Sequence, residues 1–184
     1  MRRLTTQKND VVILFDTSAS QSGLYRDDAL EALSAMIRGL GKNDRVKLVA
    51  VDVKAVPLTT GFVTVGSAEL DAALVKLMAR TPLGATDMEA GLRTAAAAFE
   101  PGTNARSVVY FGDGMSKANM FTTDSFSKLS SDLAKAHVSV SALAIGQERN
   151  ATMLAALAKQ TGGNLVIDSD EVGAPDQAGS ALAR

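Results

Sequence analysis

Residues 11–23 read VVILFDTSASQSG, and this stretch decides which fold the chain can adopt. Five apolar residues run directly into Asp16, and oxygen-bearing side chains then alternate as Asp16-x-Ser18-x-Ser20. A short, continuous apolar run of this kind is typical of a strand that is buried on both faces. The stretch therefore predicts a central strand whose carboxyl end carries one carboxylate and two hydroxyl groups.

The rest of the chain alternates strand and helix patterns. Four further apolar runs predict buried strands, at residues 46–51, 108–111, 138–145 and 165–167. Amphipathic periodicity predicts helices at residues 26–40, 68–79, 88–99, 124–136 and 150–160. Pro57 favours an antiparallel edge strand near residues 55–58. With right-handed crossovers, this order predicts a doubly wound α/β fold, with a mostly parallel central sheet and helices on both faces.

The length of 184 residues suits one domain with a substantial core. We expect a short N-terminal extension over residues 1–9, the domain over residues 10–168, and a polar tail or linker over residues 169–184, for which a weak last helix is the alternative. The chain has no cysteine, which excludes a disulfide framework and thiolate chemistry but leaves the compartment open.

The charge balance argues against nucleic acid as a partner. The 19 basic residues are matched by 20 acidic ones, and no basic block exceeds Arg2 and Arg3. No apolar run approaches the roughly 20 residues that span a bilayer, and none forms the core of a signal peptide. We therefore expect a soluble domain without direct membrane insertion, as part of a larger chain or complex.

Oxygen-bearing side chains stand at three predicted strand ends or helix starts. They are Asp16, Ser18 and Ser20, then Thr86 in PLGATDMEAG (82–91), and Asp113 in VVYFGDGMS (108–116). Ligands of such sheets bind at the carboxyl ends of the strands, so these residues are expected to converge there. Two carboxylates and three hydroxyls are hard ligands, which select Mg²⁺, Mn²⁺ or Ca²⁺ over zinc or copper.

Each of these residues also has a purely structural interpretation. The two serines suit the N-cap of the following helix. Thr86 and Glu89 have the spacing of a capping box. Asp113 lies between Gly112 and Gly114, a pattern typical of a tight turn. These interpretations explain the residues one at a time, whereas a shared cation explains them together.

With these residues, the chain resembles the von Willebrand factor type A domain family, which includes the integrin inserted domains. Members carry a metal-ion-dependent adhesion site with Asp-x-Ser-x-Ser after the first strand, a threonine in a second loop and an aspartate after a later strand. The resemblance implies that the cation, Mg²⁺ or else Mn²⁺ or Ca²⁺, is held by Asp16, Ser18, Ser20, Thr86 and Asp113.

The same resemblance implies a function in adhesion or complex assembly, without catalysis. A protein ligand would complete the metal shell with a Glu or Asp carboxylate. It further implies that ligand binding couples to movement of the last helix, expected at residues 150–160.

An enzyme of the haloacid-dehalogenase type is the alternative interpretation. The stretch FGDGMSKAN (111–119) looks like that superfamily's Gly-Asp-Gly metal motif, which would make Asp16 the nucleophile of a magnesium-dependent phosphatase or phosphotransferase. However, Ser18 stands where these phosphatases have a general-acid aspartate, and a hydroxyl cannot protonate the leaving group in its place. The sequence therefore favours the binding module over the enzyme. A structural domain with an inactive site is a third interpretation, because the sequence shows ligands and not their occupancy.

Overall fold

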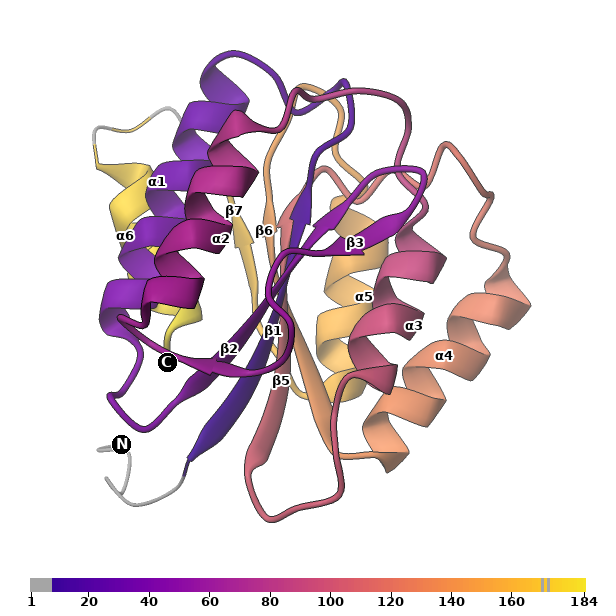
Figure 1. Cartoon of the computed structure of the whole chain (residues 1–184). Coiled ribbons are helices and arrows are strands. Elements are labelled where there is room, and N and C mark those ends of the chain that lie inside the picture. The colour runs from indigo at the N-terminus through magenta and orange to yellow at the C-terminus, as the bar shows by residue number, and fades with distance from the viewer. Residues whose placement is uncertain (1–7, 170, 172) are drawn as a thin grey trace.

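One sheet runs through the computed structural model, which describes residues 8–169, 171 and 173–184, and its seven strands lie within those residues (Figure 1). The strands are β1 (Asn9–Asp16), β2 (Arg45–Val51), β3 (Ala55–Pro57), β4 (Val63–Thr64), β5 (Ala105–Gly112), β6 (Val138–Ala144) and β7 (Leu165–Ile167). The helices are α1 (Leu24–Gly39), α2 (Ala68–Ala79), α3 (Met88–Ala97), α4 (Thr123–Lys135), α5 (Ala151–Thr161) and α6 (Ala174–Leu182). The strand order is β3-β2-β1-β5-β6-β7, with β4 also paired to β2.

The sheet is mostly parallel, which confirms the predicted fold class. Strands β2, β1, β5, β6 and β7 run parallel, while the short strands β3 and β4 both pair antiparallel with β2. Pro57 lies in β3 at the edge of the sheet, where the missing N–H costs no ladder hydrogen bond. The sequence predicted one antiparallel edge strand, and β4 adds a second one of two residues.

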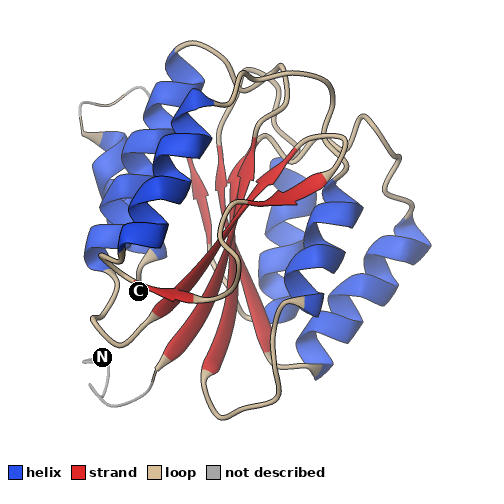
Figure 2. Ribbon diagram, in the orientation of Figure 1, coloured by secondary structure: helices blue, strands red, loops and turns tan. Residues whose placement is uncertain are grey.

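Helices cover both faces of the sheet, with α1, α2 and α6 on one side and α3, α4 and α5 on the other (Figure 2). Successive residues of β1 point to opposite faces. Ile13 and Phe15 join the core under the first group of helices, and Val12 and Leu14 join the core under the second. This two-sided burial explains why the strand has no polar residue between Asp10 and Asp16.

Within residues 169–184 the structure has the last helix and not the linker, because α6 spans Ala174–Leu182. Its side chains Ala178 and Leu182, with the following Ala183, are buried in the core. A Cβ added at Gly179 would collide with the backbone oxygen of Ala32 in α1, so the two helices approach closely. Small residues on this face make a weak hydrophobic pattern, which is why the sequence left both a linker and a weak helix open. The last helix of the described chain is therefore α6, and the helix expected at residues 150–160 is α5.

We predict that Gly179→Ala destabilises the domain by about 1–3 kcal/mol, because the new methyl group overpacks the contact with α1. The sign is informative, since alanine in place of glycine inside a helix normally stabilises by about 0.5–1 kcal/mol. Denaturant unfolding measures the effect, with Gln177→Ala on the exposed side of α6 as the control. An unchanged or higher stability of Gly179→Ala would contradict the close packing.

The two ends of the expected domain differ in what the structure describes. Most of the expected N-terminal extension, residues 1–7, lies outside the described residues, and Asn9 already belongs to β1. Within the described part of the chain, no helix has the length and apolar character needed to cross a membrane.

Candidate metal centre

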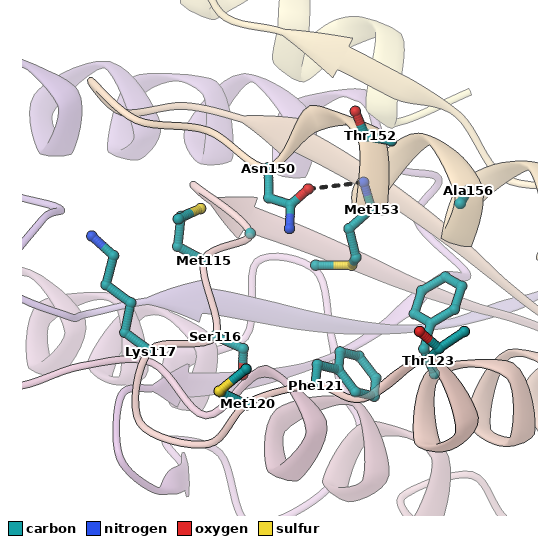
Figure 3. A pocket seen from close by; sticks show the side chains of 12 residues that line it. Met115, Ser116, Lys117, Met120, Phe121, Thr123, Asn150, Thr152, Met153 and Ala156 are labelled. Carbon is teal, nitrogen blue, oxygen red and sulfur yellow. Dashed lines mark hydrogen bonds between the residues drawn. The ribbon is translucent and has the colours of Figure 1, made fainter.

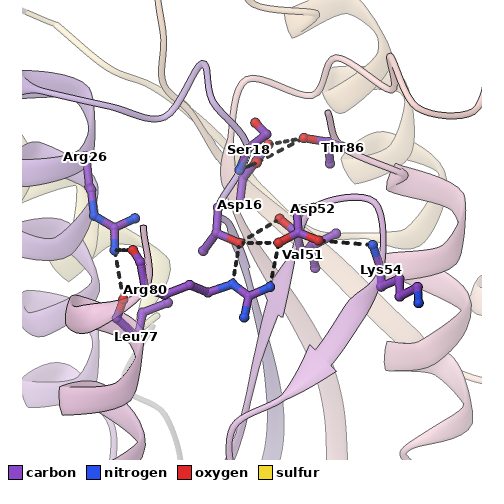
Figure 4. A network of polar contacts seen from close by, with 10 residues as sticks. Asp16, Ser18, Arg26, Val51, Asp52, Lys54, Leu77, Arg80 and Thr86 are labelled. Atoms are coloured by element: carbon purple, nitrogen blue, oxygen red, sulfur yellow. Dashed lines mark hydrogen bonds and ion pairs between the residues drawn. The ribbon is translucent and has the colours of Figure 1, made fainter. Parts of the chain in front are cut away.

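The five predicted site residues come together at the carboxyl edge of the sheet, on three loops. The Thr86 hydroxyl donates to both Asp16 carboxylate oxygens, at 3.0 and 2.9 Å (Figure 4). The Ser20 hydroxyl donates to Asp113 Oδ2 at 2.6 Å, and the Ser18 and Ser20 hydroxyl oxygens lie 3.0 Å apart. The cluster thus joins Asp16 to Thr86, which lies 70 positions later in the chain, and Ser20 to Asp113, which lies 93 positions later.

Local backbone turns aim both carboxylates into this cluster. Asp16 Oδ1 accepts the N–H of Ser18 at 2.8 Å, and Asp113 Oδ1 accepts the N–H of Met115 at 2.8 Å. Each aspartate therefore bonds the backbone two residues on, which holds its side chain in one orientation.

The structure rules out the capping interpretations of the serines and the threonine. The N-cap of α1 is Gly23, which makes no side-chain cap hydrogen bond. The N-cap of α3 is Asp87, whose carboxylate accepts the N–H of Ala90 at 2.9 Å. The hydroxyls of Ser18, Ser20 and Thr86 are therefore directed to the cluster and not to helix ends.

A buried polar network supports the loop that carries Asp16. The Thr17 hydroxyl lies 3.2 Å from Asp52 Oδ2 and accepts a hydrogen bond from Arg80 at 3.1 Å. Arg80 also donates to Asp52 Oδ2 at 2.6 Å (Figure 4). Arg26 donates in turn to the carbonyl oxygens of Leu77 and Arg80, each at 2.8 Å. These contacts join the ends of β1 and β2 to the C-terminus of α2.

Tyr110 is the residue of the cluster that the sequence did not reveal. Its hydroxyl donates to Asp16 Oδ2 at 2.8 Å and accepts the N–H of Gly114 at 3.2 Å. The side chain is fully buried in β5. A Cβ at Gly112 would collide with the Tyr110 hydroxyl and with Asp16 Cβ, so glycine is required there for this contact. A tyrosine within the otherwise apolar run at residues 108–111 was the one available signal.

Burial raises the pKa of Asp16 from its ordinary value of 3.8 to about 6, and the negative charge of Asp113 adds to this rise. The N–H and hydroxyl of Ser18 act in the opposite direction and lower the pKa. Burial likewise holds the pKa of Tyr110 well above its usual value, with the Asp16 charge acting in the same direction. Tyr110 therefore remains a hydrogen-bond donor at neutral pH. Burial therefore disfavours a negative charge on Asp16, and a cation would relieve that cost.

The sequence model of the von Willebrand factor type A domain matches residues 9–167. The chain belongs to this family. A comparison with curated proteins gives no match. The family match spans β1 to β7, so all five site residues lie inside the matched region.

Several solved structures share the fold, one of them a von Willebrand factor type A protein. That one, from Catenulispora acidiphila, has a TM-score of 0.83 and 18% identity, over 96% of this chain and 42% of that chain. Proximal thread matrix protein 1 from the mussel byssus, with a zinc-occupied MIDAS motif, has a TM-score of 0.73 and 18% identity, over 96% and 46%. Manganese-loaded TRAP protein from Plasmodium vivax has a TM-score of 0.65 and 17% identity, over 95% and 74%. These similarities concern the fold.

The donor set of this chain fits a divalent cation. It offers two carboxylates and three hydroxyls in one cluster, with no sulfur or imidazole, which suits hard cations. Among the described residues, no group of three or more His, Cys, Asp or Glu side chains is placed to hold a metal, either at this edge of the sheet or elsewhere. A cation at the carboxyl edge of the sheet would therefore need the hydroxyl oxygens as well as the two carboxylates.

Proposed function

We propose that this von Willebrand factor type A domain is a metal-dependent protein-binding module for adhesion or complex assembly. The proposal places Mg²⁺, or alternatively Mn²⁺ or Ca²⁺, among Asp16, Ser18, Ser20, Thr86 and Asp113. The supporting observation is that these five oxygen-bearing side chains, from three separate loops, lie in one hydrogen-bonded cluster. When bound, the cation would present an open coordination position to a Glu or Asp carboxylate of the partner.

Burial suggests a different role for each side of the cluster. Asp16 is 0% exposed and lies beneath the site, where its charge would balance the cation without meeting the partner. Ser20 is exposed, so the partner would approach from its side. Neutral hydroxyls there would leave the cation electrophilic toward an incoming carboxylate.

Exposed apolar side chains around the cluster favour a protein as the ligand. Leu24 follows the Ser20 loop and is 78% exposed, Leu83 shares the loop of Thr86 and is 73% exposed, and Met120 follows Asp113 and is 83% exposed. Each of the three site loops thus contributes a large apolar side chain to solvent. We infer that these three side chains form the apolar part of a protein interaction surface.

The geometry supports a binding function over the phosphatase alternative. A nucleophilic Asp16 would need one free, accessible carboxylate oxygen. In this structure the side chain is fully buried, and its two oxygens accept hydrogen bonds from Ser18, Thr86 and Tyr110. We therefore propose that the domain catalyses no phosphoryl transfer.

Isothermal titration calorimetry with MgCl₂ and MnCl₂ tests the proposed metal binding. We expect one site per chain in the wild type and loss of that site in Ser20→Ala, because one hydroxyl ligand is removed from the exposed side. Ser34→Ala on α1, whose hydroxyl donates to the carbonyl of Leu30, is the control and should bind normally. A wild type without metal binding would overturn the proposed function.

The raised pKa of Asp16 gives the metal affinity a defined pH dependence. The metal-free cluster holds a proton on Asp16 below about pH 6, and the cation has to displace it. We predict an affinity for Mg²⁺ that is constant above about pH 7 and falls toward tenfold per pH unit below about pH 6. Calorimetry at pH 5, 6 and 7.5 measures this, and equal affinity at pH 5 and 7.5 would contradict it.

A further inference from the structure

A groove of about 470 Å³ opens beside the candidate metal centre, between the β5–α4 loop and the first turns of α4 and α5 (Figure 3). Its apolar lining holds three of the seven methionines and two of the six phenylalanines of the chain. These are Met115, Met120, Met153, Phe121 and Phe126. The two phenylalanine rings meet edge to face, with centroids 5.5 Å apart. This concentration of large apolar side chains in a solvent-open groove suits an apolar ligand group.

The groove and the metal centre form one continuous surface. Gly114 lines the groove and directly follows Asp113, so their Cα atoms are about 3.8 Å apart. The N–H of Ala118 donates to the Thr86 carbonyl at 3.1 Å, and the N–H of Asn150 donates to the Asp113 carbonyl at 2.8 Å. The groove wall is thus hydrogen-bonded to two of the loops that carry site residues, and a bound segment can occupy both places at once.

The charged side chains at the rim of the groove do not favour a charged ligand group. Lys117 Nζ lies 3.2 Å from Glu148 Oε2, so the ammonium and carboxylate charges at this end of the groove compensate each other. The methionine side chains are flexible and polarizable, which lets them adapt to apolar groups of different shape.

We propose that the groove receives a large apolar side chain of the same partner segment whose carboxylate completes the cation. The partner feature that we expect to be recognised is an acidic residue with Leu, Met or Phe within about four positions. An extended segment advances about 3.3 Å per residue, so four residues reach about 13 Å from the carboxylate. This inference rests on the proposed function, because the carboxylate is what brings the segment to the groove.

Selection from a phage-displayed library of random peptides tests the proposal without knowledge of the natural partner. The full chain is immobilised in Mg²⁺, and bound phage are eluted with EDTA. We expect enrichment of Asp or Glu together with Leu, Met or Phe within about four positions. A parallel selection on Ala156→Phe, which fills the groove from α5, should keep the acidic residue and lose the apolar one.

Affinity of a selected synthetic peptide gives the second readout. Met120→Ser should weaken Mg²⁺-dependent peptide binding at least about tenfold, because a buried apolar contact is lost. Met78→Ser on α2 is the matched control, since Met78 is also exposed, at 57%, and does not line the groove. Both variants should bind Mg²⁺ alone like the wild type.

Several outcomes would overturn the proposal. Acidic enrichment without an apolar residue would show that the metal centre acts alone, which contradicts the groove proposal but leaves the proposed function intact. Absence of Mg²⁺ binding in calorimetry would remove the proposed function itself, and the groove proposal with it. A concentration-dependent dimer that Met120→Ser disrupts would place a second copy of the chain in the groove.

Discussion

Asp16→Asn is expected to abolish metal binding and, at the same time, to stabilise the metal-free domain at neutral pH. Folding raises the pKa of Asp16 from 3.8 to about 6. Between pH 3.8 and about pH 6 the folded domain therefore binds more protons at this residue than the unfolded chain does. Stability therefore falls as the pH rises through this window and remains lower above it. Above this window, the charge on Asp16 lowers the free energy of unfolding by about 3 kcal/mol, and an uncharged asparagine avoids this loss.

We expect a gain of about 1–3 kcal/mol for metal-free Asp16→Asn at pH 7.5, since the amide must share the hydrogen bonds that Thr86 and Tyr110 make to the carboxylate. Urea unfolding in EDTA measures the gain, and it should disappear near pH 4. Asp132→Asn on the exposed side of α4 should change stability by less than about 0.5 kcal/mol. A loss of stability in Asp16→Asn at pH 7.5 would contradict an electrostatic cost at this site.

Gly112→Ala is expected to lower the stability of the domain by about 3 kcal/mol and to weaken metal binding. The added methyl group collides with the Tyr110 hydroxyl and Asp16 Cβ, and both side chains are fully buried and cannot move aside. Displacing either one breaks the 2.8 Å hydrogen bond that orients the Asp16 carboxylate. Unfolding and Mg²⁺ calorimetry of the same variant measure the two effects.

Gly61→Ala provides the control for this substitution. A Cβ at Gly61 meets no atom within 4 Å, so the same chemical change should leave both stability and metal affinity nearly unchanged. If Gly112→Ala behaved like Gly61→Ala, the close contact between Tyr110 and Asp16 would not hold this site together.

The local pattern of the sequence was sufficient for the central sheet and for the five predicted residues of the cluster. Strands buried on both faces leave continuous apolar runs, and parallel strands bring their carboxyl ends to one edge. The convergence of Asp16, Thr86 and Asp113 then follows from topology, although their hydrogen bonds required the structure.

Features that depend on tertiary contact could not be predicted from local pattern. Tyr110 lies in a strand, and its role depends on the close approach that Gly112 permits across the sheet. Helix α6 binds α1 through small residues such as Gly179, which carry little hydrophobic signal. The spacing of Thr86 and Glu89 predicted a capping box, but Asp87 is the N-cap of α3, and the Thr86 hydroxyl donates to Asp16 instead.

Anomalous X-ray diffraction from crystals of the full chain grown with Mn²⁺ tests the central claim most directly. We predict an anomalous peak among the side-chain oxygens of Asp16, Ser18, Ser20, Thr86 and Asp113, with the two serine hydroxyls bound to the ion. The peak should be absent in crystals of Asp16→Asn grown under the same conditions. A wild-type crystal with saturating Mn²⁺ and no peak at this cluster would contradict the claim that it is a metal centre.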